Sequence, residues 1–170
     1  MKSDKEILLD RAISTAQKNI SSFKKKDNTV SVVEFSLASE KYAFEESYVL
    51  EVLILREITP IPGTPPFVMG VVNLRSKILS IINLKSLFNL KDRGLYDLTK
   101  VIVLGNGENC FGIVSDSIFG IREVDLNSAS QPPLNLNSAE VEFISGIFPD
   151  GQILLNAQKL LTSPKLIIKQ

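Results

Sequence analysis

The chain has 170 residues, of which 44% are hydrophobic, and its 19 basic and 19 acidic residues cancel to a formal net charge of +0. This length fits one domain or two small subdomains that share a core, and the balanced charge removes the long-range field that attracts nucleic acid or an anionic membrane. The sequence has no histidine, which excludes Ser-His-Asp and Cys-His catalytic arrangements and histidine-bound metals. We expect a protein that is not an enzyme and that needs no metal or cofactor.

The beginning of the chain and its single cysteine indicate a cytoplasmic protein. No apolar stretch approaches the roughly 20 residues of a membrane-spanning helix, and the charged start MKSDKEILLDRA lacks the apolar segment of a signal peptide. Cys110 excludes an internal disulfide and suits a reducing compartment. Because no second cysteine or basic residue lies beside it in the sequence, we expect Cys110 to be a small buried core residue.

The first predicted element is an amphipathic helix over residues 4–20, where apolar residues recur at helical spacing. Residues 21–28 predict a polar, lysine-rich linker. The helix could pack on the body of the protein, fold on a partner, or pair with a second copy to form a homo-oligomer. We therefore divide the chain into residues 1–28, the helix and linker, and residues 29–170, the main domain.

From residue 30 onward the hydrophobic pattern has a period of two, which predicts β-strands. The expected strands are 30–38, 41–46, 49–58, 67–74, 77–84, 99–105, 109–118, 119–124, 141–149 and 151–156. Asn106-Gly107 predicts a hairpin because both residue types accept a positive φ. Residues 85–90 and 157–161 predict short helices, and 165–170 a last strand or a tail. Many short strands, with long gaps around 91–98 and 127–139, predict an all-β fold of two small barrels.

Arg75 is the most unusual charged residue, because it lies between two apolar runs in the stretch GVVNLRSKILSIINL, residues 70–84. An arginine left unpaired among buried strands costs several kcal/mol, so we expect it to have a partner. Glu51 is equally out of place in the apolar run YVLEVLIL. We predict a planar, bidentate ion pair between Arg75 and Glu51, which either takes part in binding a partner or only braces the turn.

Four segments follow one another over about residues 30–161: VVEFSLASEKYAFEESYVLEV, ITPIPGTPPFVMGVVNLRSKILSIINL, FGIVSDSIFGIREV and FISGIFPDGQILLNAQKLL. In sequence and order they resemble the CheW family of bacterial and archaeal chemotaxis adaptors. Ser76 stands where the family usually has glycine, and Asn83 and Asn156 stand where aspartate is common. Because a serine side chain restricts positive-φ geometry, we expect a different turn at Ser76.

The resemblance implies two packed, five-stranded SH3-like barrels that act as a non-enzymatic adaptor between chemoreceptors and the histidine kinase CheA. A groove between the barrels would take the helical receptor tip, and we assign to it Val49, Glu51, Phe67, Met69, Gly70, Asn73 and Arg75. The apolar members of this set could also fill a barrel core, and Gly70 allows close backbone approach. We assign the kinase side to the edges around 41–45 and 85–90, with Lys41, Ala43, Glu45, Lys85 and Leu87 as candidates.

Two other functions fit the same residues. The chain could be a small-ligand-binding barrel in which Arg75 holds the carboxylate or phosphate of a metabolite, or a CheW-like scaffold in an array that controls pili or gene expression. A ligand-binding barrel predicts a ligand-dependent rise in melting temperature. An adaptor predicts a protein complex that forms without a small molecule.

Overall fold

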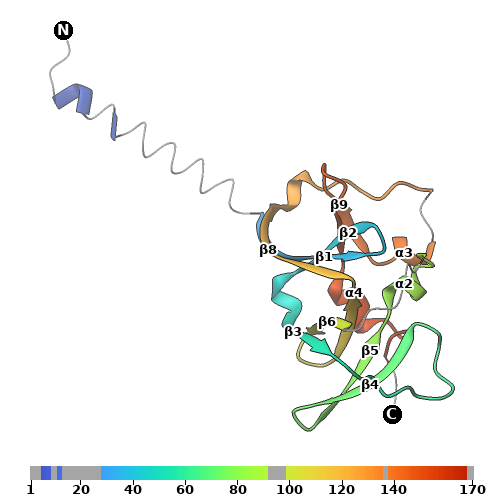
Figure 1. Cartoon of the computed structure of the whole chain (residues 1–170). Coiled ribbons are helices and arrows are strands. Elements are labelled where there is room, and N and C mark those ends of the chain that lie inside the picture. The colour runs from blue at the N-terminus through green and yellow to red at the C-terminus, as the bar shows by residue number, and fades with distance from the viewer. Residues whose placement is uncertain (1–4, 9–10, 13–27, 92–98, 136–137, 168–170) are drawn as a thin grey trace.

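The computed structural model describes residues 5–8, 11–12, 28–91, 99–135 and 138–167 (Figure 1). Its strands are β1 (Thr29–Leu37), β2 (Glu40–Glu45), β3 (Val49–Leu55), β4 (Val68–Leu74), β5 (Lys77–Ile82), β6 (Thr99–Gly105), β7 (Cys110–Ser115), β8 (Ser117–Asp125), β9 (Ile144–Ile147) and β10 (Ile153–Leu155). Short α-helices are α2 (Leu84–Leu87), α3 (Ser138–Val141) and α4 (Ala157–Thr162), and 3-10 turns lie at Glu46–Tyr48 and Leu126–Ser128. Every described helix is too short or too polar to span a membrane.

The strands form two five-stranded sheets, with the orders β8-β1-β2-β10-β9 and β3-β6-β7-β5-β4. In each sheet, the segment that follows one edge strand (β3 or β8) forms an isolated β-bridge to the other edge strand (β4 or β9). Thr59 pairs with Val71 of β4, and Ser130 pairs with Ile147 of β9. These bridges curl each sheet into a small barrel, which confirms the predicted all-β fold of two barrels.

The two barrels are built from the same succession of elements. The second barrel runs β3, β4, β5, α2, β6, β7, and the first runs β8, β9, β10, α4 and then β1, β2 from the beginning of the chain. Asn83 and Asn156 begin α2 and α4 in the same way, because each side chain accepts a hydrogen bond from a backbone N–H of the first turn. Their own N–H groups donate to the carbonyls of Phe67 and Phe143 at 2.7 Å. The barrels can therefore be compared position by position.

A shared hydrophobic core holds the barrels together. It contains buried side chains from both sheets and from α2 and α4, including the aromatic rings of Phe35, Tyr42, Phe44, Phe88 and Phe143. Phe35 stacks on Tyr42 and on Phe44, with ring centroids 5.9 and 5.0 Å apart. A smaller apolar cluster fills each barrel separately. Since most large buried side chains belong to the shared core, neither barrel has a sufficient core of its own.

A buried ion pair lies where the chain passes from one barrel to the other at Asp116, between β7 and β8. The Lys85 ammonium of α2 lies 2.7 Å from the Asp116 carboxylate, and the two side chains are 5% and 9% exposed. The other carboxylate oxygen accepts a hydrogen bond from the N–H of Ala38, in the β1–β2 turn, at 2.7 Å. The N–H of Asp116 donates to the Ser36 carbonyl. This arrangement ties α2 to the β1–β2 hairpin and orients the two sheets.

Several local expectations need correction. The expected strand 109–118 is interrupted at Asp116, and the expected strand 141–149 begins late, because Val141 ends α3 and residues 142–143 form a turn before β9. Residues 165–167 form no strand. The hairpin between β6 and β7 forms as predicted, but only Gly107 has a positive φ there. The side chain of Asn106 supports the turn instead, because its oxygen accepts hydrogen bonds from the N–H groups of Glu108 and Asn109.

Residues 5–8 and 11–12 are helical, in agreement with the amino-terminal helix. The rest of that helix, the linker up to residue 27 and residues 92–98 lie outside the described residues. The division of the chain at residue 28 and the pairing of this helix with a second copy stay predictions.

Candidate functional site

The candidate site is a cavity of about 290 Å³ at the open end of the second barrel. Its walls come from β3, from the β4–β5 hairpin and from the ends of β6 and β7. The lining side chains are Leu50, Glu51, Leu74, Arg75, Lys77, Ile78, Leu79, Val103 and Cys110. Leu79 and Val103 belong to the apolar cluster inside this barrel, so the cavity has an apolar floor and a charged rim.

The tip of the β4–β5 hairpin carries Arg75 into the rim. Leu74 pairs with Lys77, which leaves Arg75 and Ser76 as a two-residue turn. Both residues have a positive φ, 51° and 67°, as the type I′ turn of a tight hairpin requires. The expectation of a different turn at Ser76 is therefore wrong, because the strand register imposes the left-handed conformation on the serine.

Replacing Ser76 by glycine is expected to raise the free energy of unfolding by about 0.5–1 kcal/mol. Glycine removes the steric cost of a side chain in the left-handed region, part of which is offset by the greater entropy of the unfolded chain. Urea unfolding measures the difference. The matched control is Ser145→Gly, at an exposed position of β9. Ser145 does not have a positive φ, so glycine removes no steric strain there and should lower the free energy of unfolding. Equal changes in both variants would show that Ser76 is not strained.

The predicted ion pair between Arg75 and Glu51 forms, but not in the predicted way. Its contact is a single one between Arg75 Nη2 and Glu51 Oε2 at 3.0 Å, and the side chains are 79% and 25% exposed. The pair is thus neither bidentate nor among buried strands. Exposed pairs of this kind contribute about 0–1 kcal/mol to stability. The guanidinium therefore presents most of its donor groups to solvent, where a carboxylate of a partner can reach them.

The strand β3 places Glu51 at the cavity and has a row of exposed apolar side chains on its other side, of which Leu50 also lines the cavity. Leu53 and Leu55, on the same side as Glu51, pack against the core of the second barrel. On the other side Leu50, Val52 and Ile54 are 61%, 47% and 63% exposed. This row lies on the face of β3 that is turned away from the core of the second barrel.

The first barrel provides an internal comparison for the site. By strand register, Ile118, Gly120 and Ile121 of β8 take the places of Val49, Glu51 and Val52 of β3. The open end of the first barrel is occupied by Arg122, which pairs with Glu34 at 2.8 Å and Asp150 at 3.2 Å. Arg122 also donates to the side chain of Gln152. The guanidinium N–H groups of Arg122 thus bind side chains within the first barrel, whereas most of those of Arg75 face solvent, where a partner can bind them.

Of the seven residues assigned to the receptor groove, the structure brings only Glu51 and Arg75 to the cavity. Val49 and Phe67 are half-buried against the shared core, and Met69 packs against the core of the second barrel. Gly70 is buried with a φ of 145°, and a Cβ there would lie 2.2 Å from the Thr59 carbonyl oxygen, which agrees with the expected close backbone approach. Asn73 is exposed on β4.

The sequence reasoning missed Leu50, Lys77, Ile78 and Cys110 as cavity residues. In β3 nearly every residue is apolar, so the alternation that separates an inner from an outer face is absent from the sequence. Cys110 was expected in the core but is exposed. Its partial burial raises the thiol pKa, and the nearby Lys77 charge does not offset this. Cys110 therefore lines the cavity and is not an activated nucleophile.

The residues assigned to the kinase side do not share one exposed surface. Ala43 and Lys85 are buried, and Leu87 packs against the shared core. Lys41 remains exposed, and its ammonium lies 5.8 Å from the centroid of the Phe119 ring. Phe119 and Ile121 of β8 are 57% and 64% exposed. We call Lys41, Phe119 and Ile121 the β8 patch.

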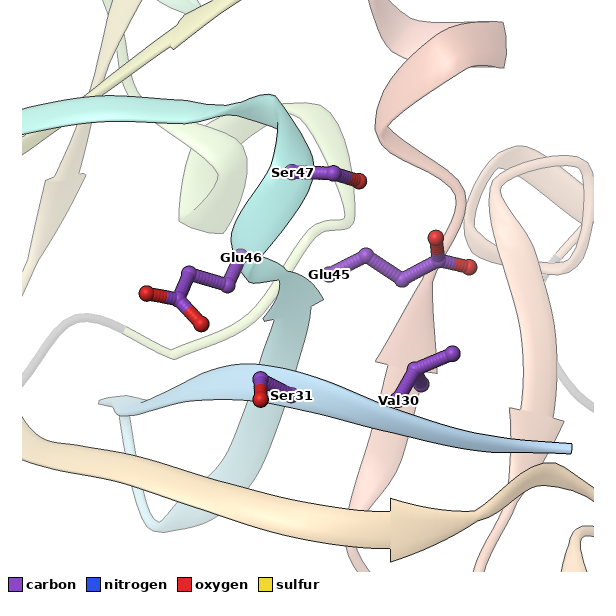
Figure 2. A pocket seen from close by; sticks show the side chains of 5 residues that line it. All are labelled: Val30, Ser31, Glu45, Glu46 and Ser47. Carbon is purple, nitrogen blue, oxygen red and sulfur yellow. The ribbon is translucent and has the colours of Figure 1, made fainter. Parts of the chain in front are cut away.

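A larger cavity, of about 470 Å³, lies between β1 and the turn after β2. Figure 2 shows its five lining residues, Val30, Ser31, Glu45, Glu46 and Ser47. The carboxylates of Glu45 and Glu46 point in opposite directions, so they do not converge on one ligand. Among the described residues no group of three or more Cys, Asp or Glu side chains is placed to hold a metal ion.

Comparison with known proteins identifies the family. The family model of the CheW-like domain matches residues 31–165. The chain belongs to the CheW family. It is 31% identical over 147 residues to chemotaxis protein CheW of Treponema pallidum (strain Nichols), with 82% of this chain and 86% of that protein covered. It is 30% identical over 121 residues to protein FrzA of Myxococcus xanthus, with 69% of this chain and 76% of that protein covered.

The crystal structure of the scaffolding protein TtCheW from Thermoanaerobacter tengcongensis has the same fold. The TM-score is 0.69 at 31% sequence identity, and the match covers 80% of this chain and 94% of that one. CheW-family proteins are adaptors and scaffolds. The resemblance seen in the sequence is thus confirmed, and the chain is a chemotaxis adaptor with the fold of that family.

Proposed function

We propose that this CheW-family chain acts in the cytoplasm and joins the helical tip of a chemoreceptor to a CheA-type histidine kinase. The observation that carries the proposal is the contrast between the two barrel ends. The first barrel satisfies its arginine internally, whereas the second leaves Arg75 79% exposed beside an apolar cavity. A scaffold of this kind supplies surfaces and no chemistry, which agrees with the absence of histidine from the sequence.

The receptor tip binds at the cavity of the second barrel. An amphipathic helix recognises such a groove by its apolar side chains, which here would cover Leu50, Leu74 and Ile78 around the rim. A carboxylate on the same helix would meet Arg75, which already holds Glu51 through one contact. Met69 packs against the apolar cluster that forms the floor of this cavity, whereas Val49 and Phe67 pack against the shared core, and Asn73 is exposed on β4.

The kinase binds at the β8 patch on the other barrel. Exposed aromatic and branched apolar side chains beside a cation are typical of interface centres, and Phe119, Ile121 and Lys41 provide them. Glu45 lies at the end of β2 opposite to Lys41 and lines the separate cavity beside β1, so it is not part of this surface. Two separate surfaces allow the chain to hold both partners at once, as an adaptor requires.

Gel filtration of the purified chain with a receptor-tip fragment and the CheA regulatory domain tests this function. We expect a three-component complex without any small molecule. Phe119→Ser should weaken binding to the kinase domain by about thirtyfold or more, the effect of losing an interface anchor, while binding to the receptor tip stays unchanged. If neither partner binds and a metabolite raises the melting temperature instead, the ligand-binding alternative replaces the adaptor.

A further inference from the structure

Tyr42 contacts two carboxylates at once. Its phenol oxygen lies 2.9 Å from Glu40 Oε2 and 2.9 Å from Glu140 Oε1. Tyr42 is fully buried in the shared core, and Glu140, on α3, is 5% exposed. Glu40, at the start of β2, is exposed. The three side chains meet beside a cavity of about 450 Å³ formed by the β1–β2 turn, α3 and the β9–β10 turn.

The two contacts require one proton more than a phenol provides. A hydroxyl group has a single proton and can donate only one hydrogen bond of this kind, and an ionised carboxylate can only accept. If both carboxylates were ionised, one of the two 2.9 Å contacts would bring together two oxygens with no proton between them. In the arrangement observed, one of the carboxyl groups therefore carries a proton and donates to the phenol oxygen.

We propose that Glu40, Tyr42 and Glu140 form a proton-binding site in which Glu140 is a carboxylic acid that donates to Tyr42 while Tyr42 donates to Glu40. Burial assigns the proton to Glu140, because desolvation disfavours the charged form of a carboxyl group and Glu40 is open to water. When the site loses this proton to solvent, Tyr42 turns its hydrogen to Glu140. The contact with Glu40 then opens and its side chain moves into the solvent.

The surrounding charges agree with this assignment. Burial raises the pKa of Glu140 and the Glu40 charge raises it further, while the hydrogen bond from Tyr42 opposes them without reversing the shift. Burial and the two carboxylates also raise the pKa of Tyr42, so the phenol keeps its own proton. The other charged side chains that line the cavity are Lys41 and Asp150. Lys41 lies over the Phe119 ring and Asp150 pairs with Arg122.

Because Glu140 of α3 contacts Tyr42 of β2 through this proton, the packing of α3 against β2 depends on pH. Since the pKa of Glu140 is higher in the folded chain than in the unfolded one, the folded state holds this proton after the unfolded state has released it. Stability from this site is therefore complete below the ordinary carboxyl pKa and is lost as the pH rises through the raised pKa of Glu140. In that window the unfolding equilibrium constant rises by up to about tenfold per pH unit.

Urea unfolding of the full chain between pH 4 and pH 8 tests the site, with wild type compared with Glu140→Gln. A glutamine amide donates to Tyr42 at every pH, as the protonated acid does, so the variant should lack the pH-dependent loss and should be more stable than wild type at neutral pH. Glu142→Gln is the control, since Glu142 is exposed and paired with Lys165. It should keep the wild-type profile.

An isotope-edited NMR titration of the Glu140 carboxyl carbon in the wild-type chain gives an answer that does not depend on how the variant folds. A midpoint clearly above the ordinary glutamate range, moved to lower pH by Glu40→Gln, supports the site. A Glu140 that titrates at the ordinary value, or a Glu140→Gln variant whose stability depends on pH as wild type does, overturns it. Neither readout requires a receptor or a kinase, so the result is separate from the adaptor function.

Discussion

Replacing Lys85 by methionine is expected to lower the free energy of unfolding by about 3–5 kcal/mol, the usual cost of removing one member of a buried ion pair. The Asp116 carboxylate would remain almost fully buried, with its charge no longer balanced by the ammonium 2.7 Å away. Because Asp116 also holds the Ala38 N–H, the loss should extend to the β1–β2 turn. Urea unfolding at neutral pH measures the change.

Two further variants show whether the loss comes from the unbalanced charge. In Lys85→Met with Asp116→Asn, both members of this pair are uncharged, and the amide oxygen of the asparagine can still accept from Ala38, so a large part of the stability should return. Lys165→Met breaks an exposed pair with Glu142 and should cost less than about 1 kcal/mol. A Lys85→Met variant no less stable than Lys165→Met would mean that the junction does not depend on this pair.

Replacing Arg75 by alanine is expected to weaken binding of the receptor-tip fragment by about 2–5 kcal/mol, or thirtyfold or more, if a carboxylate of the fragment becomes buried against the guanidinium. The free energy of unfolding should change by less than about 1 kcal/mol, because the pair with Glu51 is exposed and makes one contact. Isothermal titration calorimetry measures the affinity, and urea unfolding measures the stability of the same sample.

The matched control is Arg122→Ala, which alters the corresponding end of the first barrel. Arg122 binds Glu34, Asp150 and Gln152, so this change should lower stability more than Arg75→Ala does but should leave the affinity for the receptor tip unchanged. Arg75→Lys keeps the charge and should recover part of the binding. If Arg75→Ala lowers stability and leaves the affinity intact, the arginine only braces its turn.

Much of the fold could be predicted because its signals are local. The period-two runs, the Asn106-Gly107 turn and the short helices around 85–90 and 157–161 depend on neighbouring residues only, and the structure has strands, a hairpin and short helices there. The pairing of Glu51 with Arg75 was also predicted from two charges within apolar runs, although the two side chains meet at an exposed rim and not among buried strands. The order of motifs further identified the family, which the comparisons confirm.

What the sequence determined by itself is therefore the set of elements, the family and one ion pair, whereas the tertiary structure decided which faces remain open. Leu50 and Cys110 are exposed and Ala43 and Lys85 are buried, although their sequence surroundings suggest no such difference. The exposure of an edge strand such as β3 or β8 depends on how each barrel closes and how the two barrels pack around the shared core. That packing joins residues far apart in the chain, such as Lys85 and Asp116, and no local pattern reports it.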